Sequence, residues 1–286
     1  GGVIGMEFAF LYRNFGVEVT VIEYMDRVLP MVDEDVSKEI TRAAKKARIK
    51  LITGGKVVKI EEKGEQKAVL TYQSKKGEKE IISERVLFAT GREPNLDGLN
   101  LENTKISQNA NRPGIKVDEY LRTNVTNIYA IGDVNHIMQL AHGASSQGIV
   151  AVDHILGKDS KFNQKAVPNV IFTSPEIATV GLSEEECKEK KIDYSISKVP
   201  FLANGKALIM NKNSGFIKLI KENETDEIIG GTIIGPDAST LINTLTLMVD
   251  KKFRDRDMMD LILPHPTTGE LIHEGIYEFT IGALHK

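Results

Sequence analysis

The residues best suited to chemistry stand at the start of the chain, where Gly1, Gly2 and Gly5 precede an apolar stretch that predicts a helix. With one more glycine before Gly1 the string would read G-x-G-x-x-G, the turn between strand and helix in dinucleotide-binding units. The first retained glycine would let the backbone approach a pyrophosphate, the last would let the helix pack on a strand, and the N–H groups at the helix start would bind phosphate oxygens. We therefore expect a dinucleotide site and an N-terminal truncation. A glycine-rich turn without a ligand is the alternative.

Glu23 strengthens this interpretation, because it ends the predicted strand 17–22 about 20 residues after Gly2. At that place an acidic side chain can bind both ribose hydroxyls of an adenosine. The same carboxylate would repel a 2′-phosphate, so the pattern favours NAD over NADP. A solvated charge at the end of a strand is the alternative.

The composition sets the class of protein. A length of 286 residues predicts two domains at about 150 residues per domain. Hydrophobic residues make up 41% and charged residues 27%, which is typical of globular proteins. The net charge of −3 does not indicate a nucleic-acid binder, and no apolar run approaches the ~20 residues needed to cross a bilayer. We expect a soluble protein that binds neither nucleic acid nor membrane.

One cysteine, Cys187, excludes an internal disulfide and a metal site built from several cysteines. This count fits a reducing compartment, and we interpret Cys187 as incidental. No metal-ligand spacing is found, so no metal is expected. Five histidines are therefore predicted to be structural or surface residues: His136, His142, His154, His273 and His285.

The elements that must position these residues follow from periodicity. An amphipathic helix at 33–48 predicts a crossover to a parallel strand at 49–53. Breaks at Gly64 and Gly77 indicate an antiparallel meander of strands 57–61, 68–73 and 80–82. Buried strands are predicted at 86–89, before a turn at 90–95, and at 128–131. Beyond residue 167 we predict strands at 170–172, 216–220 and 228–235 and helices at 183–190 and 239–252.

Several segments, in order along nearly the whole chain, resemble motifs of the pyridine nucleotide-disulfide oxidoreductases, most closely of the members that oxidise dihydrolipoamide. Beside the glycine turn they are 27–30, 89–95, 129–134, 140–142 and 265–270. Segments 172–176 and 180–182 resemble the opening of the interface domain of that family.

The resemblance implies an α/β fold in three parts. These are a Rossmann-type NAD-binding domain at 1–96 with a truncated start, the C-terminal part of an FAD-binding domain at 97–164, and an α+β interface domain at 165–286. The residues expected to bind NAD are Gly1, Gly2, Val3, Ile4, Gly5, Met6, Glu7, Glu23, Val57 and Gly91.

The residues expected to bind FAD are Gly132, Asp133, Gln139, Leu140, Ala141 and His142. By resemblance, Asp133 accepts a hydrogen bond from a ribityl hydroxyl, a task that suits a buried strand-end carboxylate because it is an acceptor only. An Asx turn or a helix cap is the alternative for Asp133. Gln139 stands where the family commonly has methionine, a change that a backbone contact should tolerate.

The resemblance assigns catalysis to His265 and Glu270. The imidazole takes a proton from a dithiol, and the carboxylate holds its tautomer and stabilises the imidazolium. A cis bond before Pro266 is also implied. Two structural readings compete, because residues 267–270 fit a capping box and His265 could be a loop residue that Pro266 keeps extended. The dyad and the cap are compatible, since a capped helix would position the carboxylate.

The implied reaction is oxidation of dihydrolipoamide by NAD through a redox disulfide and FAD. The family carries that cysteine pair in an FAD-binding segment before the NAD domain, so we expect it upstream of Gly1 and expect this chain alone to be inactive. A glutathione reductase-like enzyme is one alternative, although such enzymes generally use NADPH and Glu23 argues against it. A non-catalytic nucleotide-binding and dimerisation fragment is the other.

The resemblance also implies the partners of the chain. They are a second copy of the chain and the lipoyl domain of an acyltransferase or the H protein of glycine cleavage. A bacterial cytoplasm or a mitochondrial or plastid matrix would fit, and we favour the cytoplasm.

Overall fold

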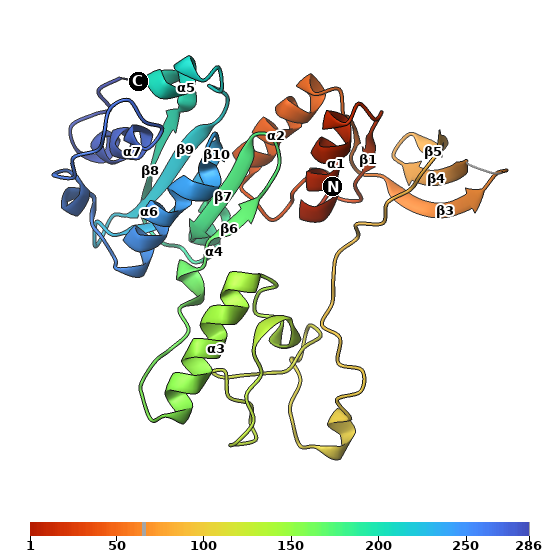
Figure 1. Cartoon of the computed structure of the whole chain (residues 1–286), viewed down its shortest axis with the longest axis horizontal. Helices are drawn as coiled ribbons and strands as arrows, with labels where there is room; N and C mark the ends of the chain where they lie inside the picture. The colour runs from red at the N-terminus through yellow and green to blue at the C-terminus, as the bar shows by residue number, and fades with distance from the viewer. Residues whose placement is uncertain (65–66, 286) are drawn as a thin grey trace. The chain divides into compact units, whose positions relative to one another are not determined.

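The computed structural model describes residues 1–64 and 67–285. The chain forms two compact units (Figure 1). One unit combines Gly1–Thr90 with the chain from Pro168 onward, and the other is Gly91–Val167. Together the helices and strands give a mixed α/β fold, which confirms the expected fold class.

The first unit opens with two helices and two parallel strands. Helix α1 (Val3–Asn14) begins directly after Gly2, and helix α2 (Glu34–Lys46) joins strand β1 (Thr20–Ile22) to strand β2 (Lys50–Ile52). These two strands pair in parallel, as the crossover predicts. Strand β1 is shorter than the predicted strand 17–22 because its ladder with β2 extends over three residues only.

A three-stranded antiparallel sheet follows, as the glycine breaks predict. Its strands are β3 (Lys56–Glu62), β4 (Ala68–Ser74) and β5 (Gly77–Ser83), in the order β3-β4-β5. The central strand β4 buries Val69, Thr71 and Tyr72.

Two predicted strands are wrong. Residues 86–89 form no strand, and Leu87 and Phe88 are 52% and 70% exposed. Residues 128–131 contribute only an isolated bridge between Tyr129 and Arg122. An apolar run becomes a strand only where a neighbouring strand takes up its hydrogen bonds, and no strand in the described ranges pairs with either segment.

The unit Gly91–Val167 contains helix α3 (Ala141–Ile155) and three short 3-10 helices. These are η1 (Leu101–Asn103), η2 (Gly132–Asn135) and η3 (Gln164–Ala166). Helix α3 packs against η2.

The rest of the first unit is built on a five-stranded antiparallel sheet in the order β6-β7-β10-β9-β8. Its strands are β6 (Asn169–Ile171), β7 (Glu176–Gly181), β8 (Tyr194–Pro200), β9 (Phe216–Glu222) and β10 (Ile228–Gly235). Helix α6 (Ala238–Asp250) contacts β7 and β10, and helix α7 (Glu270–Thr280) contacts β8 and β9. The shorter helices are α4 (Glu184–Glu189), α5 (Gly205–Ile209), η4 (Phe201–Ala203) and η5 (Asp255–Met258).

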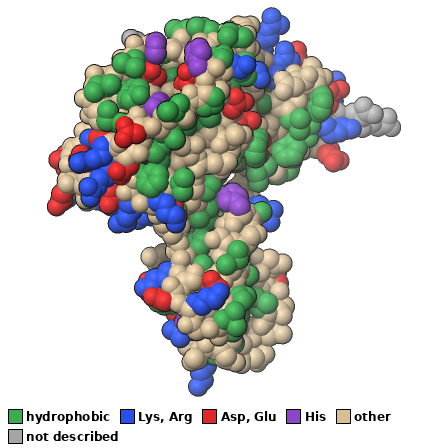
Figure 2. All heavy atoms as spheres, turned by 60° about the vertical axis from the view of Figure 1, so that its left-hand side comes forward, with side chains coloured by type: hydrophobic (Ala, Val, Ile, Leu, Met, Phe, Trp, Pro, Cys, Tyr) green, Lys and Arg blue, Asp and Glu red, His purple; other side chains and the backbone are tan. Residues whose placement is uncertain are grey.

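The surface carries both signs of charge. Figure 2 shows basic and acidic side chains interspersed over the visible face, in keeping with the net charge of −3. Among the helices of the described residues, none combines the length and the apolar character needed to span a bilayer.

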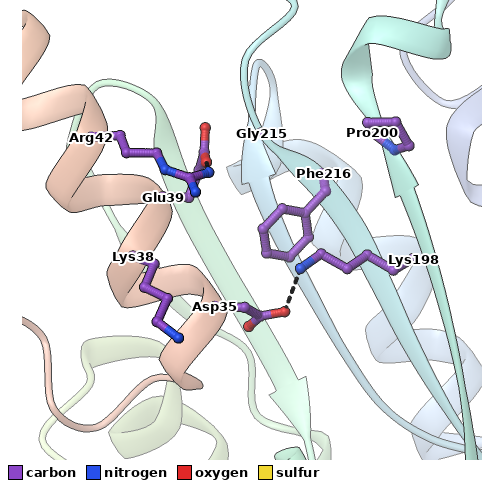
Figure 3. A pocket seen from close by; sticks show the side chains of 8 residues that line it. All are labelled: Asp35, Lys38, Glu39, Arg42, Lys198, Pro200, Gly215 and Phe216. Atoms are coloured by element: carbon purple, nitrogen blue, oxygen red, sulfur yellow. Dashed lines mark hydrogen bonds and ion pairs between the residues drawn. The ribbon is translucent and has the colours of Figure 1, made fainter.

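An ion network joins α2 to the five-stranded sheet. The Lys218 ammonium is 1% exposed and lies 2.6 Å from Asp33 Oδ2 and 2.8 Å from Asp35 Oδ1. Asp35 also pairs with Lys198 at 2.7 Å, at the edge of a hollow of about 480 Å³ beside Phe216 (Figure 3). The two stretches that make up the first unit are therefore held together by charge as well as by apolar packing.

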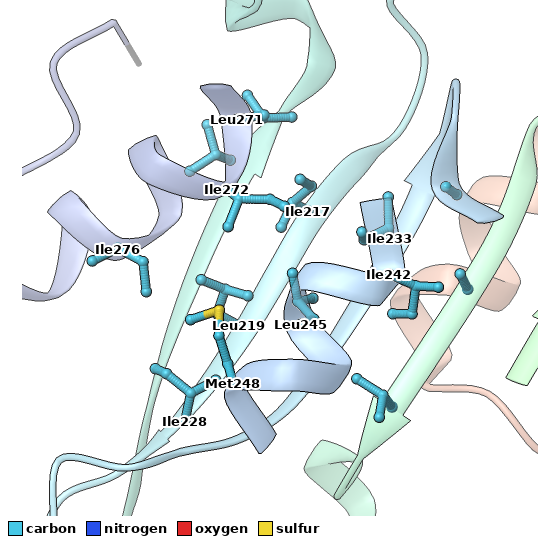
Figure 4. Packing of buried hydrophobic residues seen from close by; sticks show 14 of the residues in the cluster. Ile217, Leu219, Ile228, Ile233, Ile242, Leu245, Met248, Leu271, Ile272 and Ile276 are labelled. Carbon is cyan, nitrogen blue, oxygen red and sulfur yellow. The ribbon is translucent and has the colours of Figure 1, made fainter. Parts of the chain in front are cut away.

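Apolar packing forms two main cores in the first unit. One lies between the sheet and helices α6 and α7, and Figure 4 shows Leu219, Leu245 and Ile276 meeting there. The other joins Met6 and Ile40 of the stretch Gly1–Thr90 to residues of the sheet such as Ile171 and Ile177.

Candidate functional site

The structure brings His265 and Glu270 together at the start of helix α7. Glu270 is the first residue of the helix, and its Oε1 lies 2.8 Å from His265 Nδ1. Its other oxygen, Oε2, accepts the Thr267 N–H at 2.8 Å. The His265–Pro266 bond is cis, as predicted.

This contact fixes the roles of the two ring nitrogens. A carboxylate only accepts hydrogen bonds, so Nδ1 of His265 donates to Glu270 and Nε2 is left as the basic nitrogen. The His265 side chain is 78% exposed, whereas that of Glu270 is 29% exposed. The imidazole is therefore open to a group that approaches from solvent.

The pKa of Glu270 lies below its ordinary value. Burial raises the pKa of this carboxyl, but the hydrogen bonds from the Thr267 N–H and from His265 outweigh that effect. Glu270 is therefore ionised at neutral pH and can stabilise a protonated imidazole.

The capping-box reading is half right. Glu270 accepts the Thr267 N–H, but the Thr267 hydroxyl donates to the Pro264 carbonyl instead of capping the helix. The cap position is Gly269, which has no side chain to accept a hydrogen bond. The loop before α7 therefore depends on Glu270 itself.

Two residues that support this loop were missed by sequence reasoning. Asn204 Nδ2 donates to the Thr267 carbonyl at 3.0 Å, and the Thr268 hydroxyl donates to Asp237 at 2.9 Å. These partners are 63 and 31 residues apart in the chain, and no local pattern in the sequence marks such contacts.

The expected NAD site is gathered at the start of α1. A Cβ placed on Gly2 would have open space around it, and one on Gly5 would meet the Ala89 side chain at 3.4 Å. Helix α1 has no side-chain cap and no acidic residue in its first turn, so its N-terminus suits a phosphate. Glu23 follows β1, and its Oε2 lies 2.9 Å from the Gly1 nitrogen. The glycine turn and the Glu23 carboxylate thus lie side by side, an arrangement that fits the pyrophosphate and the ribose of a dinucleotide.

The other residues expected to bind NAD lie along α1, on β3 and at the start of the second unit. The Met6 side chain is fully buried and its N–H bonds to the Gly2 carbonyl. Glu7 accepts the Phe172 N–H at 2.8 Å. Val57 lies on β3 and is 41% exposed. Val3 and Ile4 form the first turn of α1, and Gly91, with φ of +113°, opens the second unit.

The expected FAD residues lie around η2 and the start of α3. Gly132 has φ of +73°, which favours glycine, and a Cβ there would meet the Ala144 side chain at 3.3 Å. The expectation that Asp133 is buried is wrong, because its side chain is 45% exposed and lies 3.6 Å from Arg92. The segment before it makes one bridge instead of a buried strand, so the carboxylate is left at the surface. Asp133 lies inside η2 and does not cap it.

The remaining FAD residues lead into α3. Leu140 is its cap residue, and Ala141 and His142 are exposed in its first turn. Gln139 Nε2 is buried without a hydrogen-bond partner among the described residues. The left-handed Gly132, the exposed acceptor Asp133 and the uncapped helix start all fit the hydroxyls and phosphates of a flavin dinucleotide.

Comparison with protein families gives two matches. Residues 1–148 match the model of the pyridine nucleotide-disulphide oxidoreductases, and residues 167–276 match the model of the dimerisation domain of these proteins.

Two curated relatives are similar to nearly the whole chain. A dihydrolipoyl dehydrogenase of Corynebacterium glutamicum is 39% identical over 96% of this chain, and one of Bacillus subtilis is 40% identical over 100% of it. The chain spans 60% of the length of either protein.

Solved structures show the same likeness. LpdA from Mycobacterium tuberculosis matches 98% of this chain and 60% of its own, with a TM-score of 0.90 and 28% identity. The flavoprotein disulfide reductase RclA from Escherichia coli, in its Cu(II) complex, matches 96% of this chain and 62% of its own, with a TM-score of 0.85 and 28% identity.

Proposed function

The chain belongs to the pyridine nucleotide-disulphide oxidoreductase family, and from that premise we propose that it is the nucleotide-binding and dimerisation part of a dihydrolipoyl dehydrogenase. The observation that carries the proposal is the contact of His265 with Glu270, which gives the chain an oriented base. The names of the curated relatives support the choice of substrate.

We assign three functional regions. Residues 1–96 bind NAD, residues 97–164 contribute to an FAD site, and residues 165–286 form the interface with a second copy of the chain. The match of residues 167–276 to the dimerisation model supports the last assignment.

The task of the dyad is proton transfer. His265 Nε2 takes a proton from a dihydrolipoyl thiol, which produces the nucleophilic thiolate. Glu270 accepts the Nδ1–H throughout, so it keeps the ring in the required tautomer and stabilises the imidazolium. When bound, FAD supplies the two-electron chemistry between a disulfide and the nicotinamide.

The binding residues have equally local tasks. Asp133 accepts hydrogen bonds from the ribityl chain, and the start of α3, with its cap residue Leu140, binds beside the flavin through its backbone. The turn at Gly1, Gly2 and Gly5 binds the NAD pyrophosphate, and Glu23 binds the adenosine ribose. With one cysteine in the chain, the redox cysteine pair must come from another segment, so the 286-residue chain is inactive by itself.

The partners belong to the same proposal. A second copy of the chain pairs through the interface domain, and a lipoyl domain of an acyltransferase or of the glycine-cleavage H protein delivers the dithiol. We place the protein in the cytoplasm. A glutathione reductase-like activity is disfavoured, because Glu23 beside the glycine turn would repel the 2′-phosphate of NADPH.

Coenzyme binding tests the proposal. The purified chain, titrated with NADH and NADPH and followed by nicotinamide fluorescence, should bind NADH at least about tenfold more tightly. Glu23→Gln should weaken NADH binding by about tenfold or more, because it replaces a charged hydrogen bond to the ribose. Incubation with dihydrolipoamide and NAD should produce no NADH.

The matched control is Glu18→Gln, since Glu18 is exposed on the connection before β1 and should leave NADH affinity unchanged. Equal affinity for NADH and NADPH would contradict the assignment of NAD. Turnover of dihydrolipoamide by this chain alone would contradict the assignment of the mechanism.

A further inference from the structure

A buried glutamine on α3 is bound to the turn that carries Asp133. Gln147 is fully buried, and its Oε1 accepts the Gly132 N–H at 2.7 Å. One helical turn earlier, Ala144 lies against Gly132, where an added Cβ would meet its side chain at 3.3 Å. Two residues of α3, Ala144 and Gln147, therefore lie against Gly132.

The same oxygen also holds the other end of η2. Asn135, which is 1% exposed, donates from Nδ2 to Gln147 Oε1 at 2.8 Å and to the Ala130 carbonyl at 3.0 Å. Its Oδ1 accepts the Ile137 N–H at 2.9 Å. Gly132 and Asn135, which flank Asp133 in the chain, thereby both donate a hydrogen bond to Gln147 Oε1.

The orientation of the Gln147 amide is determined by its neighbours. Gly132 N–H and Asn135 Nδ2 are both donors, so the oxygen must face them. The Nε2 group is then buried without a partner among the described residues. A buried donor without a partner destabilises a fold, so packing alone would favour an apolar side chain at this position. The hydrogen bonds of the Gln147 side chain are therefore made by its Oε1 acceptor.

We propose that Gln147 is a positioning residue of the flavin site: through Oε1 it holds Gly132 and Asn135 so that the Asp133 carboxylate between them faces outward. The Asp133 side chain is 45% exposed, although Gly132 and Asn135 on either side of it are buried. The role of the turn in FAD binding rests on the function proposed above, whereas the hold of Gln147 on the turn does not.

Hydrogen exchange of the Gly132 amide, measured by NMR on the 286-residue chain, tests this hold without any cofactor. Gln147→Met removes the acceptor, and Gln147→Asn keeps an amide that is one methylene too short. Both should speed exchange at Gly132 by about tenfold or more, whereas Gln147→Glu, which keeps an acceptor and lacks the free Nε2, should stay within about threefold. Ser146→Ala, at an exposed neighbouring position, is the control.

Titration with FAD, followed by flavin fluorescence, provides the second readout. Gln147→Met and Gln147→Asn should weaken FAD binding by about tenfold relative to Gln147→Glu. Slow exchange at Gly132 in the Asn variant, or exchange in the Glu variant as fast as in the Asn variant, would overturn the assignment. If the chain shows the expected exchange pattern but binds no FAD, the proposed cofactor fails while the role of Gln147 in the turn stands.

Discussion

Glu270 illustrates how single residues work in this protein. One carboxylate accepts a backbone N–H from the loop before α7 and the Nδ1–H of His265. The first bond fixes the start of the helix, and the second fixes the base. A residue that orients the base therefore also holds the loop in which the base lies.

The pKa of Glu270 tests this double role. Because the bond from His265 helps to lower that pKa, His265→Gln should raise it toward its ordinary value, while the Thr267 N–H keeps it below that value. A lowered carboxyl pKa contributes stability above the ordinary pKa, and this contribution is lost as the pH falls through the lower, folded-state pKa. Carboxyl carbon NMR during a pH titration measures the change.

His273→Gln is a suitable control, because His273 lies on the same helix but bonds to the Met258 carbonyl. It should leave the pKa of Glu270 unchanged. An unchanged pKa in the His265→Gln variant would mean that the contact with His265 is not maintained in solution.

At the scale of elements, the antiparallel sheet depends on glycines at the ends of its strands. Gly215 precedes β9 with φ of +97°, and a Cβ there would overlap the carbonyl oxygen of Ile234 on the paired strand β10. Such an arrangement has room for glycine only.

Substitution of Gly215 should therefore be costly. We expect Gly215→Ala to lower the free energy of unfolding by more than about 2 kcal/mol, because the alanine meets both a left-handed backbone and a carbonyl. Gly205→Ala, at the first position of α5 with open space around it, should change it by less than about 1 kcal/mol. Denaturant unfolding measures both values, and equal losses would contradict the steric argument.

At the scale of the whole molecule, the ion network around Lys218 joins the stretch Gly1–Thr90 to the five-stranded sheet. Burial lowers the pKa of Lys218, but the carboxylates of Asp33 and Asp35 outweigh this effect and the pKa is raised. Burial likewise raises the pKa of Asp35, but Lys198 and Lys218 outweigh it and the pKa is lowered. Lys218 and Asp35 are therefore both charged around neutral pH.

Removal of the buried cation should weaken this junction. Lys218→Met should lower the free energy of unfolding by about 3–5 kcal/mol, because it leaves the buried carboxylate of Asp33 without its cation and leaves Asp35 with Lys198 alone. The difference from the unsubstituted chain should shrink as the pH falls through the lowered pKa of Asp35, and also as it rises through the raised pKa of Lys218. Denaturant unfolding at a series of pH values measures it.

Lys38→Met provides the matched control, since Lys38 forms an exposed pair with Glu34 and should change the free energy of unfolding by less than about 0.5 kcal/mol. A loss in Lys218→Met that is equally small, or that does not vary with pH, would show that apolar packing alone joins the two stretches.

The sequence by itself determined the local features of this protein. The glycine turn, the crossover helix and the meander follow from short-range rules of periodicity and backbone freedom, whereas His265 and Glu270 follow from the family resemblance. The family motifs add their order along the chain. These signals are local, so they can be read without knowing what packs against them.

Only the tertiary structure decided the rest. Residues 86–89 and 128–131 are apolar enough for buried strands, yet they form none because no described strand takes up their hydrogen bonds. Asp133 is exposed for the same reason. The hydrogen bond from Asn204 to Thr267 and the ion pair of Lys218 with Asp33 join residues far apart in the chain. Pairing, burial and long-range contacts depend on which surfaces meet, and a single sequence does not state that.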